Sequence, residues 1–231
     1  MIPLKDSNPT ERFPIITVVI IILNILVFLY QASLGDESVE NFVRALSLVP
    51  ARLFHASTVP PGPVPVGVTI ITSQFLHGGL LHLAGNMLYL WIFGNNVEDA
   101  MGRMRFIVFY LLCGAMASMA HAFMNDRSTI PMLGASGAIS GVLGAYVLLY
   151  PKARVLTLFT LGFFVRMIEV PAMMVLGFWF AFQFLNALVA QGESGVAWYA
   201  HIGGFIAGSA LILVFKRRDV PLWGKRRYRN I

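Results

Sequence analysis

Six long apolar segments constrain what this chain can fold into more than any other feature. They cover roughly residues 14–30, 77–95, 104–123, 136–150, 168–190 and 198–215. Most approach the ~20 residues that an α-helix needs to cross a ~30 Å hydrocarbon core. A helix also satisfies its own backbone N–H and C=O groups where no water can do so. The sequence therefore predicts an all-α membrane protein, a bundle of six transmembrane helices.

The overall composition agrees with a membrane domain. Of the 231 residues, 57% are hydrophobic and 12% are charged, and the mean hydropathy is +0.72. Soluble domains carry about 25% charged residues. We expect one domain over residues 13–215, with a short cytoplasmic N-terminus at 1–12 and a basic cytoplasmic tail at 216–231.

The basic residues predict the orientation of the chain. With six spans, both ends lie on one side of the membrane, and the other side has only Arg44, Arg52 and Arg127. The positive-inside rule then places both termini in the cytoplasm and loop 31–76 outside. No nucleic-acid motif accompanies the basic tail, so its expected partner is the anionic lipid surface. The cytoplasmic side would carry the other fourteen of the 17 Lys and Arg residues: Lys5, Arg12, Arg103, Arg105, Lys152, Arg154, Arg166, Lys216, Arg217, Arg218, Lys225, Arg226, Arg227 and Arg229.

Four of the polar residues inside apolar segments are notable, because polar side chains there are costly and often functional. His82 and Asn86 are four residues apart and therefore share one face of a helix. They could donate hydrogen bonds into one cavity, or they could only tie two helices together. Ser136 and His201 are the other two.

Small residues give a way to bring Ser136 and His201 together. Ser136, Ser140 and Gly144 recur every four residues, and so do Ala200, Gly204 and Gly208. Two helices with such stripes can pack closely, and a serine beside a histidine makes a nucleophile and its general base. From spacing alone, Ser136 could equally be one more small packing residue.

The acidic residues and the single cysteine limit the chemistry. None of the eleven Asp and Glu residues lies in the middle of a predicted span, so serine catalysis would use a dyad whose histidine is oriented by packing. His77, His82 and His201 offer three imidazoles without an H-E-x-x-H pattern or a cysteine pair, so the sequence gives only weak support for a zinc site.

Four motifs together resemble the rhomboid intramembrane serine proteases over residues 13–215. HGGLLHLAGNM at 77–87 matches the family pattern H-x-x-x-x-H-x-x-x-N, and EDAMGRMRF at 98–106 matches E-x-x-x-G-x-x-R-F. GASG at 134–137 matches G-x-S-G, and AHIGGFIAG at 200–208 matches A-H-x-x-G-x-x-x-G.

The resemblance implies a site and a substrate class. Ser136 would be the nucleophile and His201 its general base, and the resemblance implies no cofactor and no metal. The oxyanion would be held by Asn86, His82 and the backbone N–H of Ser136. The substrates would be transmembrane segments of single- or multi-span membrane proteins, entering beside the fifth helix around Trp179 and Gln183. The resemblance is to a compact prokaryotic six-helix type in the plasma membrane, with supporting positions at His77, Gly134, Gly137 and Gly204.

The chain departs from the family pattern at two places. Many members have an aromatic residue where this chain has Ser140, so another aromatic must pack on His201 or its ring is held differently. Loop 31–76 lacks the tryptophan of some members.

A catalytically inactive rhomboid-like adaptor or chaperone is the main alternative, although such relatives usually lack the serine or the histidine. A transporter would need mid-membrane charges or paired broken helices.

Overall fold

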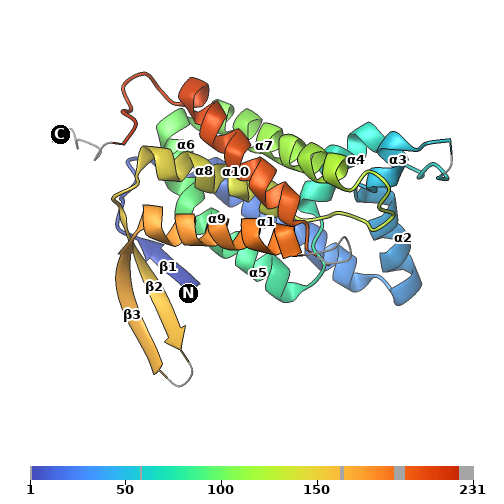
Figure 1. Ribbon diagram of the computed structural model, residues 1–231, viewed down its shortest axis with the longest axis horizontal. Coiled ribbons are helices and arrows are strands. Elements are labelled where there is room, and N and C mark those ends of the chain that lie inside the picture. The colour runs from blue at the N-terminus through green and yellow to red at the C-terminus, as the bar shows by residue number, and fades with distance from the viewer. Residues whose placement is uncertain (1, 58, 162–163, 190–195, 224–231) are drawn as a thin grey trace.

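A computed structural model describes residues 2–57, 59–161, 164–189 and 196–223, and shows a mostly helical bundle with a small sheet at one end (Figure 1). Its strands are β1 (Ile2–Asp6), β2 (Arg154–Leu161) and β3 (Phe164–Pro171). Its helices are α1 (Ile15–Ser33), α2 (Asp36–Leu46), α3 (Pro50–Phe54), α4 (Val66–Thr72), η1 (Ser73–Phe75), α5 (Leu80–Tyr89), η2 (Leu90–Gly94), α6 (Asn95–Met101), α7 (Arg103–Met124), α8 (Ser136–Leu149), α9 (Ala172–Val189) and α10 (Trp198–Phe215).

Four of the described helices, α1, α7, α9 and α10, are long and apolar enough to cross a membrane. A fifth candidate is the pair Val66–Phe75 and Leu80–Met101, bent by 83°. Helix α8 is also apolar but has only 14 residues. These helices follow the predicted segments closely, although the second begins at Leu80 rather than 77 and continues through η2 and α6 to Met101.

Helix α8 lies inside the bundle, in contact with α10. All of its residues except Ser136, Val147 and Leu148 are buried. A Cβ added to Gly208 of α10 would collide with the carbonyl of Gly141, and one added to Gly204 would collide with the carbonyl of Gly137. The two backbones are therefore in direct contact, as small-residue stripes allow. This contact places the beginning of α8 beside the beginning of α10.

The three-stranded antiparallel sheet differs from the prediction of helices alone. Its order is β1-β2-β3, so the start of the chain pairs with the connection between α8 and α9. Residues 168–171, predicted as the start of the fifth helix, belong to β3, and α9 begins only after Pro171. In β2 the buried Val155 and Thr157 alternate with more exposed residues, a period of two that favours a strand.

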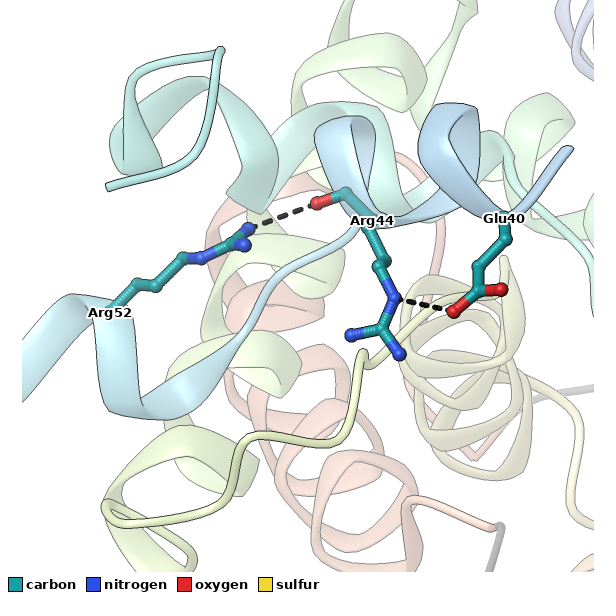
Figure 2. Close-up of polar contacts among 3 residues, drawn as sticks. All are labelled: Glu40, Arg44 and Arg52. Carbon is teal, nitrogen blue, oxygen red and sulfur yellow. Dashed lines mark hydrogen bonds and ion pairs between the residues drawn. The ribbon is translucent and has the colours of Figure 1, made fainter. Parts of the chain in front are cut away.

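The predicted loop 31–76 is largely folded. It contains α2, α3, α4 and η1, and Figure 2 shows how side chains tie its first two helices. Arg44 Nε lies 2.9 Å from Glu40 Oε1, and Arg52 Nη1 donates to the Arg44 carbonyl at 2.9 Å (Figure 2). Leu48 exchanges two backbone hydrogen bonds with Met132, which fixes the segment that leads into α8.

Lys5 in β1, Arg154 in β2 and Arg166 in β3 belong to the sheet, which lies at one end of the bundle (Figure 1). The described part of the predicted tail, residues 216–223, leaves α10 at this end, and the Arg217 N–H donates to the Ala100 carbonyl at 2.9 Å. Helix α3, which carries Arg52, lies toward the opposite end (Figure 1), and its Ala51 N–H donates to the Ser128 carbonyl, next to Arg127 in the chain, at 3.0 Å. The predicted tail beyond residue 223 lies outside the described residues.

Candidate active site

A cavity of about 790 Å³ opens between α5, α8, α9 and α10. All four polar residues singled out in the apolar segments line it: His82, Asn86, Ser136 and His201. They come from three different helices, so only the tertiary fold brings them together. Trp179 of α9 lines the same cavity.

Ser136 and His201 are in direct contact. The His201 Nε2 atom lies 2.8 Å from Ser136 Oγ, which is a hydrogen-bond distance. Ser136 is the first residue of α8, and His201 lies in the first turn of α10. The close packing of α8 on α10 explains how residues 65 positions apart meet. A nucleophile and a general base need this arrangement.

Gly134 shapes the approach to Ser136. Its φ is +126°, a conformation that L side chains rarely adopt, and its N–H donates to the Ser73 carbonyl at 2.9 Å. A Cβ here would lie 2.9 Å from Cε1 of the His82 ring. The His82 imidazole therefore packs against the backbone that precedes the serine, and only glycine leaves room for it.

Asn86 supplies a hydrogen-bond donor to the cavity. Its side chain is 7% exposed, and its Nδ2 has no hydrogen-bond partner among the described residues. Leaving a buried donor unpaired costs about 1–3 kcal/mol. The N–H of Ser136 stands at the beginning of α8, where helix N–H groups have no partner within the helix. Both groups are suited to an oxygen that carries negative charge.

The remaining predicted positions surround these residues. His77 is 2% exposed, and its ring packs edge-on against His82 with centroids 5.2 Å apart. Its backbone is held by Gln31, which accepts from the His77 N–H and donates to the His77 carbonyl, both at 3.2 Å. Gly137 and Gly204 lie in the contact between α8 and α10.

The ring of His201 has partners on α9 and α10 that local sequence patterns do not reveal. Its Nδ1 lies 2.8 Å from Oε1 of Gln183, on α9. Trp179 and Trp198 pack against it, with centroids 5.9 and 6.2 Å away. These tryptophans take the place of the aromatic missing at Ser140, whose Oγ donates to the Ser136 carbonyl at 2.6 Å.

The family resemblance implies only a place near the lateral entry for Gln183, and the lack of a mid-span acid predicts that packing alone orients the histidine. The signal that could have found it was present, because Gln183 is a polar residue in an apolar segment like the other four. Neither Asp nor Glu is among the described residues that line the cavity. The described part of the chain also has no group of three or more His, Cys, Asp or Glu residues placed to hold a metal ion.

Comparisons with known proteins agree with this architecture. Residues 66–218, more than half of the chain, match the Rhomboid domain family. The chain is 38% identical over 142 residues to "Rhomboid protease GluP" of Bacillus subtilis, covering 62% of this chain and 25% of that protein. It is 34% identical over 152 residues to "Rhomboid protein 1, mitochondrial" of Saccharomyces cerevisiae, covering 61% and 40%.

A third relative matches a longer part of the chain. "Presenilin-associated rhomboid-like protein, mitochondrial" of Bos taurus is 28% identical over 212 residues, covering 84% of this chain and 52% of that protein. The chain thus spans between a quarter and about half of the length of these relatives. With mitochondrial and bacterial proteins both among its relatives, this is a multi-pass membrane protein whose chain belongs to the rhomboid family.

Proposed function

We propose that this chain is an intramembrane serine endopeptidase that cuts membrane proteins in or near their transmembrane segments. The observation that carries the proposal is the 2.8 Å contact between Ser136 Oγ and His201 Nε2 at the wall of a cavity large enough for several peptide residues. Family membership supports the same activity, because one relative is named a rhomboid protease.

The chemistry follows from these positions. His201 Nε2 takes the proton from Ser136 Oγ as that oxygen attacks the carbonyl carbon of the scissile peptide bond. The resulting oxyanion accepts hydrogen bonds from Asn86 Nδ2, the Ser136 N–H and His82. The protonated His201 then gives its proton to the leaving amine, and an acyl-enzyme remains on Ser136. Water, deprotonated by His201, hydrolyses that ester and restores the serine.

The same proposal includes a topology. We infer six spans, formed by α1, the continuous helix of α5, η2 and α6, and then α7, α8, α9 and α10. Helix α8 covers about 21 Å at 1.5 Å per residue, which suits a short helix surrounded by protein. The sheet end, with its basic residues, would face the cytoplasm, with residues 31–76 on the outer side of a prokaryotic plasma membrane.

Cleavage of a single-span model substrate in liposomes tests the activity. Wild type should release the cut fragments, whereas Ser136→Ala and His201→Ala should be inactive while keeping the thermal unfolding midpoint of wild type. Ser118→Ala is a matched control, because Ser118 is buried in α7 and does not line the cavity. It should cut as wild type does.

Two results would contradict the proposal. Equal cleavage by Ser136→Ala and wild type would remove the serine from the chemistry. An inactive but folded wild type, tested with several substrates and with a fluorophosphonate that does not label Ser136, would favour the adaptor or chaperone alternative.

A further inference from the structure

Gln183 is a buried polar side chain on a helix that is otherwise apolar toward the bundle. It is 5% exposed, and the other buried residues of α9 are Ala172, Val175, Leu176 and Ala187. A polar group in a membrane helix is costly unless it has a partner. Asn186, less than one turn later, finds its partner on its own helix, donating to the Phe182 carbonyl at 2.7 Å. Gln183 instead reaches a second helix and meets Nδ1 of His201 at 2.8 Å.

This contact selects one tautomer of His201. The amide oxygen of Gln183 can accept a hydrogen bond but cannot donate one. The proton of the neutral imidazole must therefore be on Nδ1, and Nε2 keeps its lone pair. That lone pair lies 2.8 Å from Ser136 Oγ and can accept its proton. The other tautomer would place an Nε2–H against the serine and a lone pair against the Gln183 oxygen.

The same contact stays in place when His201 becomes charged. The serine proton moves to Nε2, while the Nδ1 proton remains on the ring and continues to point at Oε1. A hydrogen bond from a charged imidazolium is stronger than one from the neutral ring. Gln183 therefore stabilises the form of His201 that exists when the oxyanion forms.

We propose that Gln183 is a positioning residue for His201, so that the site is a Ser136–His201–Gln183 arrangement with a neutral third member. The inference rests on the proposed protease function. Trp179 lies four residues before Gln183 on the same face of α9 and packs against the same imidazole. One helix thus supplies both the hydrogen-bond acceptor and the aromatic ring that hold His201.

Two substitutions separate positioning from structure. Gln183→Met keeps the length of the side chain but removes the strong acceptor, and we expect a kcat about 10–100-fold lower with little change in KM. Gln183→Glu restores an acceptor and adds a negative charge that favours the imidazolium. It should recover much of the kcat lost in Gln183→Met. It should also move the acid limb of the kcat/KM pH profile to higher pH.

Asn186→Ala is the matched control, because it removes a side-chain amide from the same helix without touching His201. Its kcat and pH profile should equal those of wild type. The inference is overturned if Gln183→Met matches Asn186→Ala in kcat, or if the acid limb of the pH profile does not move in Gln183→Glu.

The two proposals fail in different ways. If the wild type neither cuts nor is labelled at Ser136, the protease function itself is wrong. If the wild type cuts, Ser136→Ala is inactive and Gln183→Met is fully active with an unchanged pH profile, only the role of Gln183 is wrong. Thermal unfolding of each variant, measured in the same detergent, shows whether a lost rate reflects a lost fold.

Discussion

Glu98 holds the beginning of α1 through Thr17. The Thr17 N–H and hydroxyl both donate to Glu98 Oε2 at 2.8 Å, and the Ile16 N–H donates to Oε1 at 3.0 Å. The first N–H groups of a helix have no partner within it, and a carboxylate also complements the positive end of the helix dipole. Glu98 is 3% exposed, and the turn after it uses Gly102 at a φ of 86°. Two residues of the motif at 98–106, Glu98 and Gly102, therefore have a structural explanation.

Replacing Glu98 should weaken the fold. In Glu98→Gln one carboxylate oxygen becomes an NH₂ group that faces helix donors, so we expect the free energy of unfolding to fall by about 2–3 kcal/mol. Thermal unfolding in detergent measures the loss. Glu37→Gln is the control, because Glu37 is an exposed acid in the first turn of α2 and should change stability by less than about 0.5 kcal/mol. Equal stability of the two variants would show that Glu98 is not needed to hold α1.

Replacing Asn86 should lower activity without lowering stability, unlike the Glu98 substitution. Because its buried Nδ2 has no partner among the described residues, Asn86→Ala removes an unsatisfied donor and should not lower the unfolding midpoint. Its kcat should fall about 10²–10³-fold, the usual effect of losing one oxyanion donor.

Asn125→Ala is the counterpart to Asn86→Ala. The Asn125 amide donates to the His121 carbonyl at 3.0 Å, so this variant should lose about 1 kcal/mol of stability and keep its kcat. Full activity of Asn86→Ala would remove Asn86 from the oxyanion site.

The contact between α8 and α10 should tolerate no added methyl group. A Cβ at position 208 would collide with the Gly141 carbonyl, so Gly208→Ala should lower the free energy of unfolding by about 3 kcal/mol and reduce cleavage by separating Ser136 from His201. Gly177→Ala on α9 is the control, because no atom lies within 4 Å of its added Cβ. Alanine is the better helix former, so this variant should gain about 0.5–1 kcal/mol. A stable, active Gly208→Ala would contradict the close packing.

Asp6 should make stability depend on pH. Burial raises the pKa of this carboxyl above its ordinary value of 3.8, while a hydrogen bond from the Tyr146 hydroxyl at 2.6 Å acts in the opposite direction. The unfolded chain therefore ionises Asp6 at lower pH than the folded chain does. The contribution of Asp6 to the free energy of unfolding is fully present below its pKa in the unfolded chain. It is lost as the pH rises through its pKa in the folded chain.

Unfolding midpoints measured from pH 4 upward test this sign. Wild type should lose stability relative to Asp6→Asn as the pH rises through the folded pKa of Asp6. In Tyr146→Phe the pKa-lowering hydrogen bond is gone, so the decline should extend to higher pH. If the unfolding midpoints of wild type and Asp6→Asn differ by the same amount at every pH in this range, Asp6 titrates alike in the folded and unfolded chains.

The local pattern of the chain was enough to predict its long apolar helices, and it singled out four polar residues that line one cavity in the fold. The apolar segments at 104–123 and 198–215 became α7 and α10 within one residue at each end. The predictions were less accurate where two structures suit the same apolar residues. Residues 168–171 adjoin the apolar sequence of α9, yet they pair with β2 in the sheet. Hydropathy alone does not reveal a partner strand, so the prediction placed them in the helix. Loop 31–76 contains helices too short for a membrane-span pattern to indicate.

By itself the sequence determined which segments could be helices in a membrane, and it placed Ser136 and His201 among small residues at helical spacing. Those features depend on neighbours along the chain. Only the tertiary structure decided that Gln183 meets Nδ1 of His201 across 18 residues and that Ser136 meets Nε2 across 65. It also decided that Asn86 lines the cavity with an unused donor. The physical reason is that a hydrogen bond between helices requires packed backbones at a specific distance and angle, which one-dimensional periodicity does not contain.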